Sequence, residues 1–352
     1  MTYQQALQLL QKKQSLGIQP GLTRILSLLQ LMGNPQNQLK IIHIAGTNGK
    51  GTVAATLAQA IQNAGYRVGL FTSPWVIDYR EQIQLNGVFI PEDRLAAYVA
   101  QYADNDCTEF EFLTAVMYRY FADEAVDYAV VECGMGGKGD ATNVERENLA
   151  VITAISLDHT DFFGSSLLDI AEEKAGILRP NSPCVLFPDN RIKPVFSGKC
   201  SSLITPRLPN NLSLVNCVLS QLHLPPVTSL VKLPARQEKI GRILLDGGHN
   251  TAAADHLAPL LHKEVAVIGM MKDKDVEGYL ARVASRCKTV IATQPSHPRA
   301  LDAATLADIA EDYCDNVLVV DAPADAVRHP SLSLVCGSFY LAREVRNILL
   351  SR

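Results

Sequence analysis

Residues 46–52 read Gly46-Thr47-Asn48-Gly49-Lys50-Gly51-Thr52, and they lie between two regular patterns. An apolar, β-branched run at residues 39–44 comes before them, and a helical pattern at residues 52–63 follows. Glycines let backbone N–H groups curl around phosphate oxygens, and the N-terminus of the next helix favours negative charge. The stretch therefore predicts a phosphate-binding loop (P-loop) between a strand and a helix.

Two side chains of this loop have specific roles in such sites. The Lys50 ammonium can reach the outer phosphates of a nucleotide, and the Thr52 hydroxyl can ligate Mg²⁺. Ser or Thr usually follows the lysine directly, whereas Gly51 intervenes here, so the loop is a variant. The alternative is an ordinary glycine-rich turn, which the flanking strand and helix make the weaker interpretation.

The rest of the chain alternates short apolar runs with helical patterns, which is typical of a mostly parallel sheet covered by helices. We predict an α/β protein with two domains: a P-loop-type, mostly parallel sheet domain with N-terminal helices at residues 1–237, and a smaller Rossmann-like α/β domain at residues 238–352. The pattern weakens at residues 181–233, which are rich in Pro, Ser and Asn. Predicted strands cover residues 39–44, 67–71, 128–132, 150–155, 243–245, 265–268, 289–291 and 317–320, and predicted helices cover residues 52–63, 109–121, 211–222 and 339–350.

Composition excludes several classes of protein. The chain has 352 residues, of which 47% are hydrophobic, and a formal net charge of −4, so no broad attraction to nucleic acid or membranes is expected. No apolar run approaches the roughly 20 residues that cross a bilayer. The eight cysteines form no C-x-x-C pair, which argues against a zinc site and a disulfide scaffold. A cytoplasmic protein is expected, since the N-terminus lacks an apolar signal core.

Polar residues follow two predicted strands. Glu132 ends the strand at residues 128–132, and His159 follows the strand at residues 150–155. Ligands bind at the carboxyl ends of parallel strands, where a carboxylate such as Glu132 can hold Mg²⁺. Asp158 and Asp161 could orient the His159 imidazole. Capping of a helix by Glu132 and a structural hydrogen bond from His159 are the alternatives.

Further motifs occur in a definite order along the chain. Together they resemble the folylpolyglutamate synthase/dihydrofolate synthase family of the Mur ligase superfamily, from the N-terminal helices to the C-terminal helix with a gap in the middle. The resemblance rests on the loop and on Phe71-Thr72-Ser73-Pro74, Glu109-Phe110-Glu111-Phe112-Leu113-Thr114-Ala115, Glu132-Cys133-Gly134-Met135-Gly136-Gly137, Asp140-Ala141-Thr142-Asn143, Leu157-Asp158-His159-Thr160, Glu173-Lys174-Ala175-Gly176-Ile177 and Asp246-Gly247-Gly248-His249-Asn250.

The resemblance implies an ATP-dependent amide ligase with Mg²⁺ as cofactor. Such an enzyme joins L-glutamate to a folate-type carboxylate, dihydropteroate or tetrahydrofolyl-glutamate or both, through an acyl phosphate. A monomer is expected, and neither nucleic acid nor a membrane is expected as a partner.

The resemblance also implies roles for individual residues. Lys174 is carbamylated in the family, and only that form could ligate Mg²⁺; a salt-bridged helix lysine is the alternative. Arg236 would otherwise be a solvated linker charge, and Asn250 a helix cap. The implied catalytic residues are Lys50, His159 and Lys174; the ATP-binding residues are Gly46, Thr47, Asn48, Gly49, Lys50, Gly51, Thr52, Asn211, Arg236, Asp246 and His249; the metal ligands are Thr52, Glu132, His159 and Lys174; and the substrate-binding residues are Thr72, Ser73, Pro74 and Arg299.

Several positions depart from the family pattern. On the acceptor side, Trp75 replaces a usual His, while Arg80 and Gln82 replace a usual Asn and Arg. The stretch at residues 184–233 is shorter than in the family. Smaller departures are Lys138-Gly139 for Arg-Leu, Ala235 for Gly and Gly248 for Ala. Two other functions therefore stay open: a Mur-type ligase with a different carboxylate acceptor, and an inactive nucleotide-binding regulator.

Overall fold

The computed structural model of the chain describes residues 1–17 and 19–352, and the side chain of Asp161 lies outside the described part. The chain forms two compact units. The first comprises Met1–Ile155 and Phe163–Val231, and the second comprises Ser156–Phe162 and Lys232–Arg352. The sequence-based division at residues 237/238 instead placed residues 156–162 and 232–237 in the first domain.

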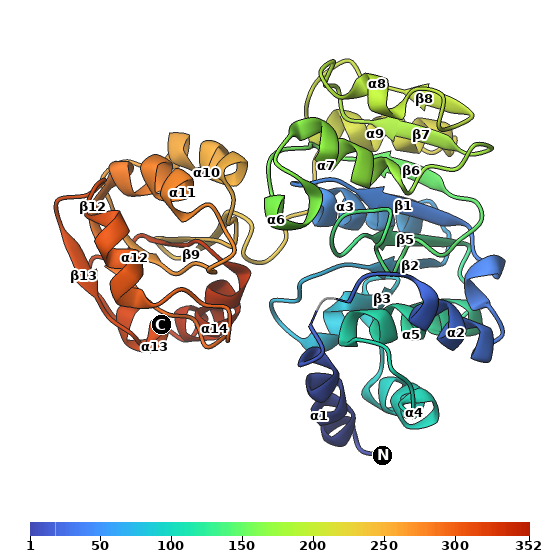
Figure 1. Cartoon of the computed structure of the whole chain (residues 1–352), viewed down its shortest axis with the longest axis horizontal. Helices are drawn as coiled ribbons and strands as arrows, with labels where there is room; N and C mark the ends of the chain where they lie inside the picture. Colours follow the sequence, from blue (N-terminus) through green and yellow to red (C-terminus); the bar gives the residue numbers. More distant parts are fainter. Residues whose placement is uncertain (18) are drawn as a thin grey trace. The chain divides into compact units, whose positions relative to one another are not determined.

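The first unit is built on an eight-stranded sheet with the order β4-β3-β2-β5-β1-β6-β7-β8 (Figure 1). β1 (Ile41–Ala45) lies between β5 (Tyr128–Glu132) and β6 (Leu149–Ile152), parallel to both. Every residue of β1 is buried, as expected for a central strand with covered faces. The outer strands are β2 (Val68–Phe71), β7 (Pro183–Leu186) and β8 (Ser202–Ile204), which continue the parallel part, and β3 (Ile83–Leu85) and β4 (Val88–Phe89), an antiparallel hairpin at one edge.

Helices cover this sheet. The apolar sides of α1 (Tyr3–Gln14), α2 (Thr23–Leu31) and α5 (Glu109–Asp123) share one buried cluster with residues of β5. α3 (Lys50–Asn63) contacts β2, β5 and α9 (Asn211–Gln221). The other helices are α4 (Glu92–Tyr102), α6 (Thr160–Phe163), α7 (Leu167–Ala175), α8 (Lys193–Phe196) and the 3₁₀ turns η1 (Pro35–Gln38) and η2 (Tyr79–Gln82).

Capping boxes determine where several of these helices begin, among them α5 and α7. At α5, the Glu111 carboxylate accepts a hydrogen bond from the Thr108 N–H, and the Thr108 hydroxyl accepts one from the Glu111 N–H. Ser166 and Asp169 make the same reciprocal pair at α7. Such boxes satisfy N–H groups that the first helical turn leaves unpaired. They fix the starting residue of α7, the helix that carries Lys174.

The second unit contains a six-stranded sheet with the order β13-β12-β11-β14-β10-β9 (Figure 1). The last strand, β14 (Leu334–Cys336), is inserted between β10 (Ile243–Asp246) and β11 (Glu264–Ile268), parallel to both. β12 (Cys287–Ala292), β13 (Val317–Val319) and the antiparallel edge strand β9 (Glu238–Ile240) complete the sheet, and the helices are α10 (Thr251–Leu257), η3 (Ala258–Leu260), α11 (Val276–Val283), η4 (Ala284–Arg286), α12 (Ala303–Ala310), α13 (Pro323–Ala326) and α14 (Phe339–Leu350).

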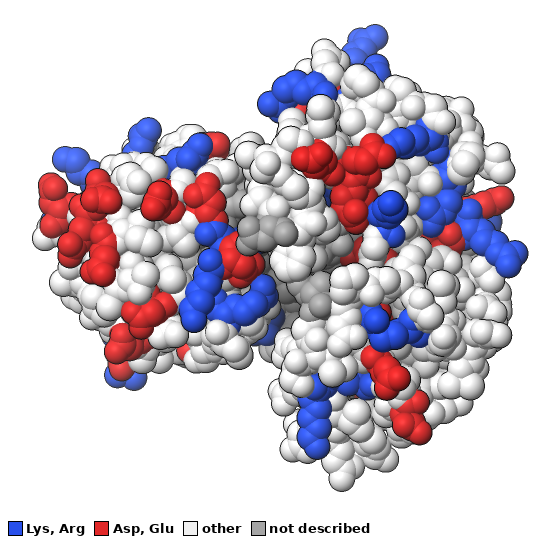
Figure 2. Space-filling model, in the orientation of Figure 1, with Lys and Arg blue, Asp and Glu red and all other residues white. Residues whose placement is uncertain are grey.

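The predicted α/β class with two mostly parallel sheets is confirmed, although several predicted strand bounds differ from the observed ones. The strand predicted at residues 150–155 ends at Ile152, because the carbonyl of Ala154 turns to accept hydrogen bonds from the phosphate loop. No helix among residues 1–17 and 19–352 has the length and apolar character of a membrane span. On the visible face of the first unit, acidic and basic side chains form small groups among uncharged residues (Figure 2).

Candidate active site

The phosphate loop joins β1 to α3, and its backbone is held against the chain that follows β6. The N–H groups of Thr47 and Asn48 donate to the carbonyl oxygen of Ala154, at 2.9 and 3.3 Å. Gly46 has a φ of 149°, and a Cβ atom at this position would lie 1.8 Å from Oγ1 of Thr153. Gly46 therefore has no room for a side chain.

A second glycine of the loop is constrained by a predicted nucleotide-binding residue. Gly49 has a φ of 89°, and a Cβ atom there would lie 2.6 Å from Nδ2 of Asn211. Asn211 is the first residue of α9, so the structure brings this side chain next to the loop. Gly51 and Thr52 lie in the first turn of α3.

Lys50 faces a buried carboxylate at the end of the neighbouring strand. Its Nζ atom lies 4.0 Å from Oε1 of Glu132, whose side chain is 2% exposed, and 3.3 Å from the carbonyl oxygen of Thr47. The other carboxylate oxygen of Glu132 accepts a hydrogen bond from the Ser73 N–H at 3.3 Å. Glu132, the predicted metal ligand, thus contacts both Lys50 of the loop and Ser73 of the predicted acceptor segment, at the carboxyl ends of the parallel strands.

Lys174 is buried in α7, beside the glycine-rich loop that follows Glu132. A Cβ atom on Gly137 would lie 2.9 Å from the Cα atom of Lys174. Glu173 anchors the same loop, because its Oε1 atom accepts from the N–H groups of Gly137 and Gly139 at 3.3 and 3.2 Å. This anchoring role was missed from the sequence, where a glutamate beside a helix lysine is typical of a solvated surface.

The predicted acceptor-binding residues Thr72, Ser73 and Pro74 follow β2 directly. The Thr72 N–H donates to the carbonyl oxygen of Gln82 at 3.1 Å, and the Ser73–Pro74 peptide bond is cis. The ring of Trp75, which replaces the usual His, lies edge-on to the Tyr79 ring with centroids 6.1 Å apart.

Arg80, another departure from the family pattern, is bound within the first unit. Its guanidinium lies 2.8 Å from the carboxylate of Asp78, 3.6 Å from that of Glu92 and 5.5 Å from the centre of the Tyr3 ring. The hydrogen bond from Arg80 lowers the pKa of Asp78. Arg80 therefore ties the acceptor segment to α1 and α4.

In the second unit, predicted nucleotide-binding residues gather at the end of β10. Burial raises the pKa of Asp246, whose carboxylate accepts from the N–H groups of Gly248 and Gln237 at 2.7 and 3.0 Å. The guanidinium carbon of Arg236 lies 4.6 Å from the centre of the Phe339 ring.

A buried charge cluster adjoins these residues within the second unit. The Nζ atom of Lys274 lies 2.7 Å from Oδ1 of Asp158 and 3.3 Å from Nε2 of His159. Asn250 donates to Asp158 at 2.9 Å, and Nε2 of His249 lies 3.8 Å from the same carboxylate. Burial favours protonated Asp158, but Lys274 and the histidines outweigh it and lower its pKa. Burial and Lys274 lower the pKa of His249 to about 4.

Lys274 was missed from the sequence, because a run of alternating charges is ordinarily a solvated loop. An ammonium group can only donate, so Nε2 of His159 accepts a hydrogen bond from Lys274 only in the tautomer that leaves Nε2 unprotonated. Among the side chains that the structure describes, no three His, Cys, Asp or Glu residues converge to hold an ion. The predicted metal ligands are divided between the two units, with Thr52, Glu132 and Lys174 in the first and His159 in the second.

Arg299, predicted to hold a substrate carboxylate, lies at another part of the second unit. It is 3.3 Å from the carboxylate of Asp273 and donates to the Tyr340 hydroxyl at 3.3 Å. The Tyr340 ring stacks on His297, with centroids 4.0 Å apart.

Comparisons with known proteins match both units. The family described as "Mur ligase middle domain" matches residues 44–199, and "Mur ligase, glutamate ligase domain" matches residues 235–338. Folylpolyglutamate synthase of Lacticaseibacillus casei is 32% identical over 93% of this chain and 94% of its own. Dihydrofolate synthase/folylpolyglutamate synthase of Bacillus subtilis is 29% identical over 99% of both chains.

Solved structures agree with the sequence matches. E. coli FolC in complex with DHPP and ADP superposes with a TM-score of 0.88 at 27% identity, covering 100% of this chain and 98% of that one. The bifunctional folylpolyglutamate synthase/dihydrofolate synthase of Yersinia pestis, complexed with AMPPNP and Mn ion, has a TM-score of 0.84 at 27% identity, over 99% and 98% of the two chains. The chain belongs to the folylpolyglutamate synthase/dihydrofolate synthase family of Mur ligases.

Proposed function

We propose that the chain is an ATP-dependent ligase that joins L-glutamate to the carboxylate of a folate-type acceptor, dihydropteroate or a reduced folate. One observation carries the proposal: a phosphate loop whose Lys50 faces the buried Glu132 carboxylate, in a chain of this family.

The nucleotide is the best-supported substrate. Gly46 and Gly49 have positive φ values, and the loop that they shape leads into the N-terminus of α3, where free backbone N–H groups favour phosphate oxygens. Asn211 lies beside Gly49. We assign Arg236, Asp246 and His249 of the second unit to the same nucleotide, as the resemblance implies.

The residues present fit a hard divalent cation. Glu132 offers a buried carboxylate and Thr52 a hydroxyl, both oxygen ligands that Mg²⁺ prefers. His159 and Lys174 complete the proposed set, and Lys174 joins it only when carbamylation has replaced its ammonium by a carboxylate-like anion. The bound ion would neutralise charge on the phosphates during transfer.

The proposed reaction has two steps. The acceptor carboxylate takes the γ-phosphoryl group of ATP, which gives an acyl phosphate and ADP. The amine of glutamate then attacks the acyl carbon, loses a proton, and expels phosphate to leave an amide. Lys50 stabilises the charge that develops on the phosphoryl oxygens, a form of electrostatic catalysis that needs no covalent enzyme intermediate.

The acceptor binds, in this proposal, along residues 72–74, and Arg299 holds a carboxylate. Ser73 supports this placement, because its N–H group touches the same carboxylate that faces Lys50. A different carboxylate acceptor is the second candidate. It is favoured by Arg80, since Asp78 and Glu92 engage its guanidinium where the family has an asparagine.

Mass spectrometry of reaction products tests the proposal. The chain is incubated with ATP, Mg²⁺ and glutamate, with dihydropteroate or tetrahydrofolate as acceptor, and without glutamate as the control. Addition of one glutamyl unit to dihydropteroate would establish a dihydrofolate synthase, and extension of tetrahydrofolate a polyglutamate synthase. ATP binding without modification of either acceptor would reject the folate assignment and favour the second candidate.

A further inference from the structure

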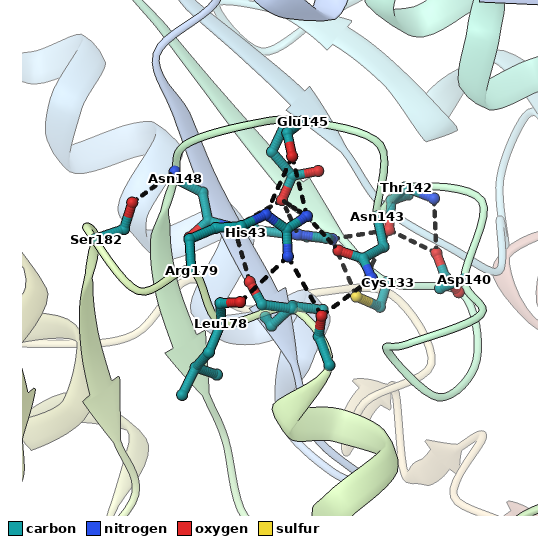
Figure 3. A network of polar contacts seen from close by, with 12 residues as sticks. His43, Cys133, Asp140, Thr142, Asn143, Glu145, Asn148, Leu178, Arg179 and Ser182 are labelled. Atoms are coloured by element: carbon teal, nitrogen blue, oxygen red, sulfur yellow. Dashed lines mark hydrogen bonds and ion pairs between the residues drawn. The ribbon is translucent and has the colours of Figure 1, made fainter. Parts of the chain in front are cut away.

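A network of buried polar side chains lies inside the first unit, and His43 is at its centre (Figure 3). His43 belongs to β1, the strand that leads into the phosphate loop, and its side chain is fully buried. Its Nδ1 atom lies 2.8 Å from Oε1 of Glu145. Its Nε2 atom lies 2.8 Å from Oγ1 of Thr142 and 3.1 Å from Sγ of Cys133. The proposed reaction assigns none of these side chains a role.

The hydrogen bonds around the ring indicate that both of its nitrogens donate. The Thr142 hydroxyl donates to Oδ1 of Asp140 at 2.5 Å, so its oxygen accepts from Nε2 of His43. The Glu145 carboxylate can only accept, so Nδ1 donates as well. Burial alone lowers the pKa of His43, but Cys133 and Glu145 outweigh it and raise the pKa well above its ordinary value.

One branch of the network reaches the segment around Glu132. Cys133, which contacts the imidazole, directly follows Glu132 in the chain. Asp140 accepts from the Thr142 N–H at 2.9 Å and, through its other oxygen, from the Met135 N–H at 2.7 Å. His43 is therefore connected to both the end of β5 and the loop beyond it.

A second branch reaches the end of the helix that carries Lys174. The backbone carbonyl of Glu145 accepts from Nε of Arg179 at 3.1 Å. Arg179 also donates to Oδ1 of Asn143 at 2.6 Å, and the Asn143 amide donates to the carbonyl of Gly176 at 3.1 Å. Because Gly176 ends α7, this branch fixes the helix terminus close to Lys174.

We propose that His43 is a positioning residue of the ligase, which holds Glu132 and Lys174 in place relative to the phosphate loop through this network. The roles of Glu132 and Lys174 rest on the proposed function. His43 acts through its hydrogen-bonded neighbours, as residues behind metal ligands do, and such residues typically contribute about 10- to 100-fold to activity.

His43→Gln tests the proposal, because glutamine keeps one donor but loses the second donor and the charge. We expect kcat to fall about 10- to 100-fold. KM for glutamate and for the acceptor should change less than about threefold, because the substitution of His43 removes no contact with either substrate. Deuterium uptake should rise in peptides that cover residues 133–143 and 174–179.

Tyr98→Phe is the matched control. It removes a hydrogen bond to Asp123, 2.6 Å long, elsewhere in the first unit, and should leave kcat and exchange of both peptides unchanged. A folded His43→Gln variant with wild-type kcat, or with uptake raised evenly over the first unit, would overturn the proposal.

A second variant covers the case in which His43→Gln does not fold. Arg179→Met removes the hydrogen bonds of Arg179 to Asn143 and to the Glu145 carbonyl, and its 3.4 Å contact with the Glu145 carboxylate, but keeps both partners of the His43–Glu145 pair. It should raise exchange at residues 174–179 and lower kcat; unchanged exchange there would overturn the proposal. If the wild-type chain has no ligase activity, the proposed function fails by itself, and localised exchange alone decides the positioning role.

Discussion

Gly46 of the phosphate loop offers a direct test of local packing. In Gly46→Ala, the new methyl group would overlap Thr153, so the free energy of unfolding should fall by about 1–3 kcal/mol. Gly198→Ala is the control: its φ of 78° is also positive, but no atom lies within 4 Å of the added carbon. Urea denaturation measures both. Equal losses would mean that backbone strain, not the contact with Thr153, constrains the loop.

Lys50 should be essential for turnover but not for folding. Lys50→Ala removes the charge that stabilises the transferred phosphoryl group, and kcat should fall about 100- to 1,000-fold. An ADP-release assay measures turnover, and thermal unfolding should show an unchanged midpoint. Lys40→Ala is the control. Lys40 is exposed and directly precedes β1, the strand that leads into the phosphate loop, so this variant should behave as wild type. Normal turnover of Lys50→Ala would reject the phosphate-loop assignment.

Cys200 should be the most readily alkylated thiol near neutral pH. A hydrogen bond with Cys184 lowers the pKa of Cys200 to about 7, and the thiolate is the reactive form. The rate of iodoacetamide modification, followed by peptide mass spectrometry, should therefore rise with pH through a midpoint near 7. Cys184→Ala should move the midpoint toward the ordinary value of about 8.5. The same midpoint in both proteins would contradict the assignment.

The site residues that could be predicted from the sequence are those that belong to a single local motif. The loop, Lys50 and Glu132 belong to local patterns that predict their position at strand ends. Lys274 could not be predicted, because its partner Asp158 is 116 residues away in the chain. His43 looked like an ordinary strand residue for the same reason, since Glu145 and Thr142 come from a distant segment.

At the scale of elements, most of the buried strands were predictable, whereas the short strands β3, β4 and β9 at the sheet edges were not. β5 spans the predicted residues 128–132, and α14 the predicted residues 339–350. β3, β4 and β9 have two or three residues each, too few to show an alternating pattern. Their pairing depends on a neighbouring strand, which no local pattern can supply.

Glu238 joins two elements of the second unit, and its contribution to the free energy of unfolding should depend on pH. It lies in β9 and accepts from Arg346 of α14 at 2.7 Å and from the Ala235 N–H at 2.9 Å. Burial opposes ionisation, but Arg346 and Ala235 outweigh it and lower the pKa of Glu238. The contribution is therefore present above the unfolded-state pKa and is lost as pH falls through the folded-state pKa.

Glu238→Gln measures this contribution. Because the pair is partly exposed, the variant should lose only about 0.5–1 kcal/mol of unfolding free energy at pH 7. The difference from wild type should shrink as pH falls below about 4.5, the ordinary range for glutamate. Urea denaturation at several pH values gives the comparison. A difference that grows on acidification would contradict the sign.

At the scale of the whole molecule, each unit has its own apolar core, but the second unit takes a segment from the middle of the chain. Sequence patterns predicted two consecutive domains, because apolar periodicity does not report which core a short loop joins. Residues 156–162 contain few apolar side chains, and it is the charge of Asp158 that pairs with Lys274 of the second unit.

Asp158→Asn tests how far the segment at residues 156–162 stabilises the second unit. Both charges are buried, with exposed fractions of 8% and 7%, so removal of one should cost about 3–5 kcal/mol. Hydrogen exchange of peptides from residues 232–352 would locate the loss. Asp255→Asn is the control, since its pair with Arg282 is exposed and should cost at most about 1 kcal/mol. Equal effects would mean that the buried pair adds no stability.

Residues 156–162 are also synthesised well before the rest of the unit to which they belong. Asp158 leaves the ribosome 116 residues before Lys274, which at 5–20 residues per second is a delay of roughly 6–23 seconds. During that interval the sheet strands β1, β5 and β6 are already translated, whereas the partners of residues 156–162 do not yet exist. A nascent chain stalled before residue 232 would therefore expose Asp158 to solvent, and burial of this carboxylate would report that the second unit has been completed.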